Sequence, residues 1–166
     1  MSLFLGLKEN EMLVELNENE IQEVLKMNSI GRIGCTDGVN VYIVPINYLY
    51  EQDAVLCYSL EGLKIDMMRN HPSVCFEVDE INNSYQWKCV IANGVFEEIT
   101  GEEELRQLIP RYTEYTLRER ASLPALSETE NKEHQNKINS DQVFYRIRFE
   151  KVSGRFEGGF YSNTKN

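Results

Sequence analysis

A proline inside an otherwise apolar, strand-like run is the feature that most constrains the fold of this chain. Residues 39–64 hold two such runs followed by a short loop, and Pro45 interrupts the first run. Because proline cannot donate to a ladder, its strand lies at a sheet edge, a bulge or a break in pairing. Lys64 follows a Ser-x-x-Gly turn at an expected helix start, where a cation opposes the helix dipole unless an anion binds there. We therefore expect residues 39–64 to form a cradle for a flat, phosphorylated ligand.

The bulk properties indicate one ordinary globular domain over residues 1–166. The chain has 166 residues, enough for a substantial core, with 42% hydrophobic and 27% charged residues. No stretch approaches the roughly 20 apolar residues of a membrane span. The first residues lack the basic leader and the long apolar run of a signal peptide. These observations predict a cytoplasmic protein without a membrane partner.

The charge balance argues against a nucleic-acid partner. The net charge is −10, from 27 acidic and 17 basic residues. A nucleic-acid binder needs a basic stripe to neutralise phosphates. Arg111, Arg118 and Arg120 come closest to one, but Glu114 and Glu119 are interspersed among them. This pattern is typical of a solvated helix face.

Cysteine and histidine usage gives no sign of a metal site. The four cysteines lie far apart inside apolar runs, without a Cys-x-x-Cys pair, and His71 and His134 are the only histidines. We expect buried, reduced thiols and no bound metal.

Hydrophobic alternation and turn residues predict a meander of strands. Asp37-Gly38 is a strong hairpin signal, and Asn93-Gly94 indicates either a bulge in one long strand or a tight hairpin that splits it. The predicted strands are 29–36, 39–50, 54–59, 73–79, 85–99 and 142–152.

Helical spacing predicts three short helices, at 18–28, 62–70 and 100–118. Asn17 and Glu20 have the spacing of a capping box at the start of the first helix, and Thr100 and Glu103 have it at the start of the third. Pro110 is expected to restart or kink the third helix.

These elements predict a mainly β fold, a closed or nearly closed barrel of six to seven mostly antiparallel strands with short helices. Closure buries many strands without leaving exposed edges. Residues 1–13 are interpreted as a flexible arm, and 121–141 as a polar loop that is either a lid or a plain surface segment. Residues 153–161 are expected to be a glycine-rich exit.

Residues 39–64 contain the kinds of groups that would bind a flavin mononucleotide. Its phosphate needs donors and a cation, which Ser59, the amides of 61–63 and Lys64 could supply. Its polar ring edge needs backbone groups outside a ladder, and a strand broken by proline at 44–47 leaves such groups free, beside the side-chain amide of Asn47. A simple helix cap, a solvated lysine and an ordinary edge strand explain the same residues.

Five segments in this order resemble the pyridoxamine 5′-phosphate oxidase-related superfamily, in particular its branch similar to nitroimidazole-resistance proteins. They are Ile30-Gly31-Arg32-Ile33-Gly34, Ile43-Val44-Pro45-Ile46-Asn47-Tyr48, Tyr58-Ser59-Leu60-Glu61-Gly62-Leu63-Lys64, Asn70-His71-Pro72-Ser73-Val74-Cys75-Phe76-Glu77-Val78 and Trp87-Lys88-Cys89-Val90-Ile91-Ala92-Asn93-Gly94.

The resemblance implies an FMN-binding split β-barrel that forms a homodimer with FMN at the subunit interface. It places Val44, Pro45, Ile46 and Asn47 along the isoalloxazine edge. It assigns the phosphate to Tyr58, Ser59 and Lys64, and it brings Trp87, Cys89 and Val90 close to the ring. Cys89 stands where the family usually has serine or glutamine, and Tyr58 stands where many relatives have histidine.

The sequence thus favours an FMN-dependent oxidoreductase, a reductase of a small organic acceptor, such as a nitroaromatic compound, with NAD(P)H as donor. Flavin carries the redox chemistry, so no acid–base residue is assigned. A flavin or haem storage protein on the same barrel is the alternative, and a ligand-free interaction domain is a third reading.

Overall fold

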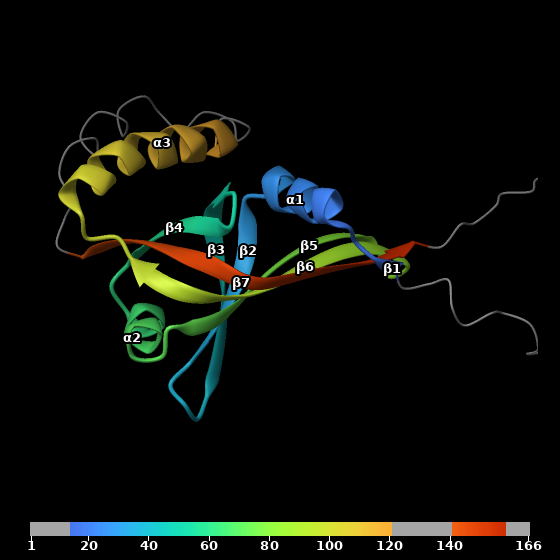
Figure 1. Cartoon of the computed structure of the whole chain (residues 1–166), viewed down its shortest axis with the longest axis horizontal. Coiled ribbons are helices and arrows are strands. Elements are labelled where there is room, and N and C mark those ends of the chain that lie inside the picture. Colours follow the sequence, from blue (N-terminus) through green and yellow to red (C-terminus); the bar gives the residue numbers. More distant parts are fainter. Residues whose placement is uncertain (1–13, 121–140, 159–166) are drawn as a thin grey trace, which may run out of the picture.

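The computed structural model describes residues 14–120 and 141–158 (Figure 1). The expected arm at 1–13 and residues 121–140 of the expected polar loop lie outside the described residues. Strands and short helices alternate along the chain. In order they are β1 (Val14–Glu15), α1 (Glu18–Met27), β2 (Ile30–Thr36), β3 (Val41–Glu51), β4 (Ala54–Leu60), α2 (Leu63–Asn70), β5 (Ser73–Asn83), β6 (Gln86–Glu98), α3 (Glu102–Arg120) and β7 (Gln142–Gly158).

The strands form one antiparallel sheet that closes on itself. Its order is β1-β7-β4-β3-β2-β5-β6, and β6 also pairs with β7. β7 closes the ring because its first half lies against β4, while β6 follows it along almost its whole length. The predicted mainly β fold, a closed ring of antiparallel strands with short helices, is confirmed.

α1 begins where the sequence predicts. The side chain of Asn17 accepts the amides of Asn19 and Glu20, and the Glu20 carboxylate accepts the amide of Asn17 at 2.8 Å. The predicted capping box is therefore present. The helix buries Val24 and Leu25 against the inside of the sheet.

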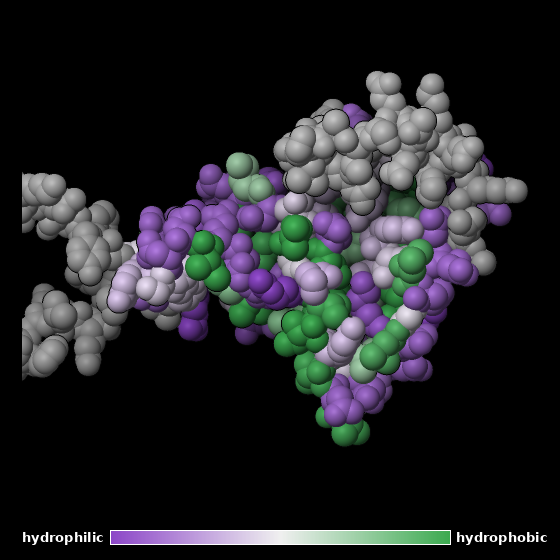
Figure 2. Space-filling view, turned by 180° about the vertical axis from the view of Figure 1, so that it is seen from behind, coloured by the Kyte–Doolittle hydropathy of each residue, from purple (hydrophilic) through white to green (hydrophobic). Residues whose placement is uncertain are grey.

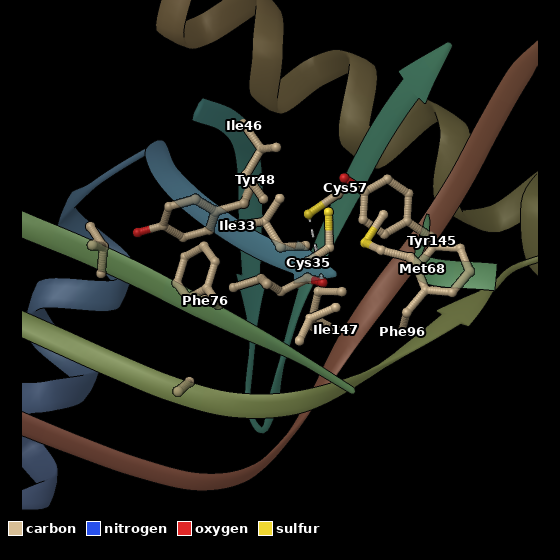
Figure 3. Packing of buried hydrophobic residues seen from close by; sticks show 14 of the residues in the cluster. Ile33, Cys35, Ile46, Tyr48, Cys57, Met68, Phe76, Phe96, Tyr145 and Ile147 are labelled. Atoms are coloured by element: carbon tan, nitrogen blue, oxygen red, sulfur yellow. Dashed lines mark hydrogen bonds between the residues drawn. The ribbon is translucent and has the colours of Figure 1, made fainter. Parts of the chain in front are cut away.

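Apolar and aromatic side chains fill the ring (Figure 3). The rings of Tyr48 and Phe76 meet edge to face at a centroid distance of 5.0 Å. The buried Tyr48 hydroxyl donates to the carbonyl of Leu25 at 3.0 Å. This hydrogen bond satisfies the phenol and ties α1 to β3, because a buried polar group without a partner would be costly.

α3 covers a second, smaller core, in which Leu108 and Tyr112 pack against Leu56 of β4 and Phe144 of β7. The helix runs through Pro110 as one element, so the proline does not restart it.

The predicted capping box at the start of α3 is wrong. The first helical bond runs from the amide of Leu105 to the carbonyl of Gly101, and the Glu103 carboxylate instead accepts from Arg106 and Gln107. Glycine, which is also a favoured residue at a helix start, therefore takes the position expected of threonine.

Pairing across the sheet makes two strands longer than their sequence pattern suggests. β5 extends to Asn83, and β7 extends to Gly158, where a glycine-rich exit was expected. Both ends gain a neighbour in β6, whose Gln86 lies opposite both Asn83 and Gly158. The ladder thus outweighs the local preference of the glycines.

β6 is one continuous strand, in register with β5 through Asn93 and Gly94, so the alternative hairpin is wrong. Its register with β7 shifts between Asn93 and Gly94, but the extra residue is Glu150 of β7, so the irregularity predicted at this place lies in the neighbouring strand. A Cβ at Gly94 would lie 2.5 Å from the carbonyl oxygen of Arg148, so this close approach of two backbones requires glycine.

No helix in the described part of the chain is long and apolar enough to cross a membrane.

We expect Gly94→Ala to destabilise the protein by about 1–3 kcal/mol, the usual cost of forcing extra volume into a packed site. The added Cβ meets rigid backbone rather than a side chain that can move. Gly34→Ala is the matched control, because its Cβ would meet atoms only from 3.7 Å outward. Urea unfolding of both variants measures the difference, and equal losses of stability would contradict the close approach at Gly94.

Candidate functional site

The first part of the candidate site is the free edge of β3. This strand pairs with β2 from Val41 to Asn47, but with β4 only from Tyr48 to Glu51. Within the described residues, β3 therefore has a neighbouring strand on one side only between 41 and 47.

The direction of one hydrogen bond decides which backbone groups face β2. The amide of Tyr48 donates to the carbonyl of Ser29 at 3.0 Å, toward the β2 side. Backbone groups alternate in direction along a strand, so those of Val44 and Ile46 also face β2. The side chain of Ile46 is buried, and that of Val44 packs against the core. These two predicted ring contacts thus have neither backbone nor side chain on the free edge.

The backbone groups of Ile43, Pro45 and Asn47 face the free edge by the same alternation. The ring nitrogen of Pro45 points away from β2, so the missing N–H costs the ladder nothing. The edge presents the amides of Ile43 and Asn47 together with the carbonyls of Ile43 and Pro45. It therefore offers two donors with two acceptors between them along an extended backbone.

The second part of the site is the start of α2. Its N-cap is Gly62, at φ 154° and ψ −174°, and no side chain caps the helix. Only glycine adopts this backbone region without strain. The first hydrogen bond of this turn runs from the amide of Asp66 to the carbonyl of Gly62, so the amides of residues 63–65 have no cap within the described residues. Free amides at a helix start bind anions.

Lys64 lies in this first turn with its side chain half-buried. Burial lowers the pKa of its ammonium group, while the nearby thiols of Cys57 and Cys35 oppose that shift. No carboxylate of the described residues forms an ion pair with it. A half-buried cation at the positive end of a helix is unfavourable unless an anion joins it.

The other predicted phosphate residues lie at the end of β4, next to α2. The Ser59 hydroxyl donates to the carbonyl of Leu60 at 2.9 Å, so it would have to rotate to donate to a phosphate. Tyr58 is half-buried, and its ring lies against Phe144 and Tyr112 at centroid distances of 5.1 and 6.3 Å. Tyr58 therefore belongs to the small core as much as to the site.

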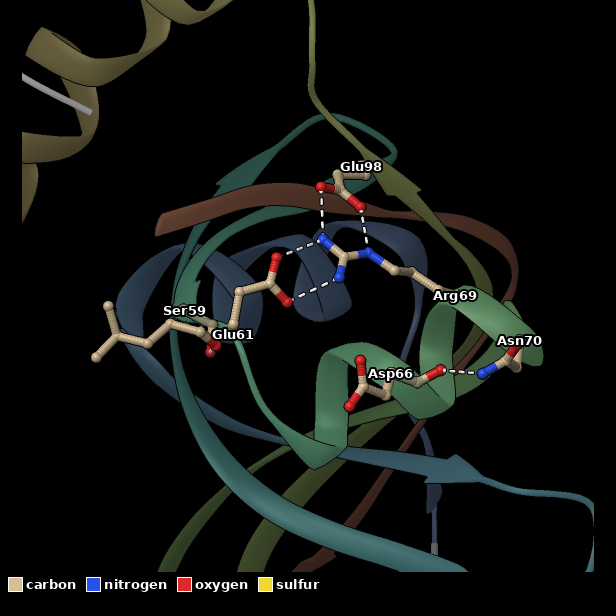
Figure 4. A network of polar contacts seen from close by, with 7 residues as sticks. Ser59, Glu61, Asp66, Arg69, Asn70 and Glu98 are labelled. Atoms are coloured by element: carbon tan, nitrogen blue, oxygen red, sulfur yellow. Dashed lines mark hydrogen bonds and ion pairs between the residues drawn. The ribbon is translucent and has the colours of Figure 1, made fainter. Parts of the chain in front are cut away.

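Arg69, at the other end of α2, is held by two carboxylates (Figure 4). Its guanidinium donates to both oxygens of Glu61 at 2.7 and 2.8 Å and to both oxygens of Glu98 at 2.7 and 2.8 Å. These pairs lower the pKa of Glu61 and raise that of Arg69. Arg69 thus fixes the segment before α2, and its donors are already used.

The third part of the site lies on the outer face of β5 and β6. The Trp87 indole donates to Glu157 at 2.8 Å, and the Cys89 thiol donates to Glu77 at 3.6 Å. Burial, followed by the charge of Glu77, raises the pKa of Cys89 to about 11, so this thiol stays protonated. Val90 points the other way and is fully buried.

An apolar groove of about 540 Å³ crosses this outer face. Arg32 lies beside it and pairs with Glu77 at 3.0 Å and with Asp79 at 2.9 Å. Figure 2 shows apolar side chains on one face of the molecule and on the protruding β2–β3 hairpin. Exposed apolar residues of the outer face and hairpin include Val41, Ile43 and Ile91, which are 72%, 65% and 41% exposed.

The ten predicted site residues therefore fall into separate groups. Pro45 and Asn47 lie on the free edge, and Ser59 and Lys64 lie near the start of α2. Cys89 is three strands away from β3, roughly 14 Å at about 4.8 Å per strand. Val44, Ile46 and Val90 turn their side chains inward.

Sequence reasoning missed Arg69, Tyr112 and Arg32. Their partners lie 8 to 65 residues away along the chain, so no local motif reveals these contacts. No group of His, Cys, Asp and Glu in the described residues is arranged to hold a metal ion.

The fold and site define a split barrel, a closed antiparallel ring in which two neighbouring strands separate beside an uncapped helix. Residues 17–156 match the family model described as pyridoxamine 5′-phosphate oxidase. The chain belongs to the pyridoxamine 5′-phosphate oxidase family.

Individual proteins with similar sequence or structure span several bacteria. An uncharacterised protein of Rhizobium meliloti is 33% identical over 84 residues, which cover 51% of this chain and 56% of that protein. A FAD-binding protein from Mesorhizobium loti has a TM-score of 0.70 and 27% identity, with 88% of this chain and 99% of that chain covered. A 5-nitroimidazole antibiotic resistance protein from Bacteroides thetaiotaomicron has a TM-score of 0.62 and 18% identity, with 87% of each chain covered. At that identity, the last likeness concerns the fold alone.

The half-buried Lys64 predicts a pH dependence of stability in the ligand-free protein. Its pKa in the folded state is below the ordinary value of 10.5, so the folded state binds fewer protons than the unfolded state between these two values. The ammonium group therefore costs stability below its folded pKa, and this cost disappears as pH rises through that interval.

We expect the stability difference between Lys64→Met and the wild type to be largest near neutral pH, in favour of the variant, and to shrink as pH rises toward 10.5. Lys26→Met, at an exposed position of α1, is the control, for which we expect a smaller pH-dependent difference. Urea unfolding of the apoprotein at several pH values measures both. A pH-independent effect at Lys64 would show that burial of its charge is not the cause.

Proposed function

We propose that this protein binds FMN and acts as an oxidoreductase, a reductase of a small organic acceptor such as a nitroaromatic compound. One observation carries the proposal. The free edge of β3 and the uncapped, lysine-bearing start of α2 lie on the two sides of the point where β3 and β4 separate. An extended row of backbone donors and acceptors thus faces the same gap in pairing as an anion site.

The start of α2 suits a phosphate monoester. The amides of residues 63–65 supply donors, and Lys64 supplies a positive charge that has no carboxylate partner among the described residues. The uncapped amides and the half-buried ammonium group each destabilise the free protein. A bound phosphate would relieve both, because it accepts from the amides and neutralises the ammonium group.

The free edge of β3 suits the polar edge of an isoalloxazine ring. That edge carries carbonyl oxygens on either side of an N–H group. The amides of Ile43 and Asn47 are donors for such oxygens, and the carbonyls of Ile43 and Pro45 are acceptors for the N–H group. The flavin would supply hydride or electron transfer when bound, and the protein would bind and orient it.

The charges near α2 favour FMN over FAD. Arg69, the other cation of this helix besides Lys64, is already bound by Glu61 and Glu98. A second phosphate of FAD next to the first would meet these carboxylates rather than another cation. The similarity to a FAD-binding protein makes FAD the competing ligand.

We propose further that two copies pair through the outer face of the sheet, with FMN at their interface. In one chain, Trp87 and Cys89 are too far from the β3 edge to touch the same ring, so a second copy would have to bring them there. The exposed apolar side chains of this face would be buried by such pairing. NAD(P)H is the proposed electron donor.

We expect Lys64→Ala to weaken FMN binding by about 1.5–3 kcal/mol, roughly ten- to 150-fold, the range for a hydrogen bond to a charged group. Riboflavin has the same ring without the phosphate, so its affinity should not change. The wild type should bind FMN more tightly than FAD. Fluorescence titration of the apoprotein with the three flavins measures these affinities, and equal loss of FMN and riboflavin would remove Lys64 from the phosphate site.

Reduction kinetics then separate the enzyme from a storage protein. A loaded protein whose flavin absorbance bleaches with NADH or NADPH, and recovers when a nitroaromatic acceptor is added, acts as a reductase. Yellow protein that neither donor reduces would favour storage, and colourless protein that ignores added FMN would contradict flavin binding altogether.

We expect Ile91→Lys to shift the protein from dimer to monomer and to weaken FMN binding together. Ile91 lies opposite Glu77 on the outer face, where a charge would be buried by a second copy. Val14→Lys is the control, because Val14 pairs with the partly buried Phe156 on the opposite side of the sheet. Light scattering at micromolar concentration measures the mass. A wild-type monomer, or a dimeric Ile91→Lys protein, would contradict this interface.

A further inference from the structure

Tyr112 of α3 reaches the point where β3 and β4 separate. It is 6% exposed, and its ring packs edge to face on Phe144 at a centroid distance of 6.0 Å and lies 6.3 Å from that of Tyr58. Its hydroxyl donates to the carbonyl of Asn47 at 3.4 Å. The backbone amide of Tyr58 faces the same hydroxyl and favours its ionised form. One phenol thus lies between β3 and β4.

These two backbone groups would otherwise bond to each other. The β3–β4 ladder pairs Leu49 with Leu56 and Tyr48 with Cys57, and then stops. The amide of Tyr48 faces β2, so Leu49 and Leu56 form the hydrogen-bonded pair. The next hydrogen-bonded pair of this ladder would join Asn47 and Tyr58. The hydroxyl of Tyr112 stands between the carbonyl of the first and the amide of the second.

We propose that Tyr112 is a positioning residue, which ends the β3–β4 ladder at Tyr48 and thereby keeps the free edge of β3 open for a ligand. This role rests on the proposed flavin site for its ligand, but the end of the ladder is a property of the protein alone.

Extending the β3–β4 ladder by one pair would exchange hydrogen bonding to Tyr112 for hydrogen bonds between the strands. The packing around Tyr112 therefore decides where the ladder ends. A direct bond between the strands would replace the bond from the phenol to Asn47, and the ladder would then continue toward Pro45. Tyr112 holds its place because Leu108 and Phe144 bury its surroundings and because Arg111, next to it, pairs with Glu51 at the end of β3. The ladder stops where the small core under α3 begins.

The separation has a direct consequence for Asn47. With its carbonyl held by Tyr112, its amide is left facing the gap and is not used by β4. Closing the ladder by one step would use this amide and would bring β4 against the row of groups that the ligand needs.

The test uses Tyr112→Phe, which keeps the ring and removes the hydroxyl. In the apoprotein, the amide of Tyr58 should lose the hydroxyl that it faces, so its hydrogen exchange measured by NMR should accelerate by about five- to tenfold, the fold-change for one hydrogen bond. FMN and riboflavin should both bind more weakly by a similar factor, because the ring edge rather than the phosphate is affected. This joint loss differs from the phosphate-specific loss expected for Lys64→Ala.

Tyr50→Phe is the matched control, since Tyr50 lies on the same strand with its ring stacked on Phe149 at 6.4 Å. It should change neither the exchange of Tyr58 nor flavin affinity. Unchanged exchange of Tyr58 in Tyr112→Phe would overturn the proposal, whatever the flavins do. Accelerated exchange with unchanged flavin affinity would overturn the positioning role. A wild type that binds no flavin would instead refute the proposed function, while the exchange rates would still decide what ends the ladder.

Discussion

Proline at position 45 fixes which backbone groups of β3 face β2, and the candidate site depends on that choice. A shift of the β2–β3 register by one residue would turn the proline nitrogen toward β2 and would remove a ladder bond. It would also turn the buried side chain of Ile46 to the outside. The observed register avoids both costs, and as a consequence the donors and acceptors of Ile43, Pro45 and Asn47 face the free edge.

An open edge inside a barrel is tolerable only because the rest of the sheet is closed. β7 supplies this closure by pairing with both β4 and β6, so the ring does not need a continuous β3–β4 ladder. The ladder between β3 and β4 can therefore be short. Beyond it, the small core under α3 separates the two strands. Exposed strand edges invite pairing with other chains, and here the edge is short and carries a proline.

Sequence patterns could predict the elements but not the contacts that shape the site. The capping box of α1, the hairpin at 37–38 and the edge position of Pro45 follow from residues within a few positions of one another. The full length of β7 could not be predicted, because its glycines become strand only through pairing with β6. Nor could Tyr112 or Arg69 be found, since their partners come from distant segments and the pattern of α3 gives only an ordinary amphipathic helix. The direction of the β3 backbone groups could have been inferred from the sequence, because a proline in an edge strand turns its nitrogen away from its one neighbouring strand. Since backbone groups alternate in direction, Ile43 and Asn47 face the free edge with Pro45, whereas Val44 and Ile46 face the neighbour.

The contrast between two helix starts explains why the site lies where it does. α1 is capped by Asn17 and Glu20, so its amides are satisfied within the chain. α2 begins at a glycine whose backbone angles exclude most side chains, and therefore no side chain caps it. The only cation in its first turn is half-buried and has no carboxylate partner among the described residues, while Arg69 already binds two. Each of these features costs stability in the free protein. A single bound anion would relieve the uncapped amides and the buried charge together, which is why these costs point to a ligand rather than to imperfect packing.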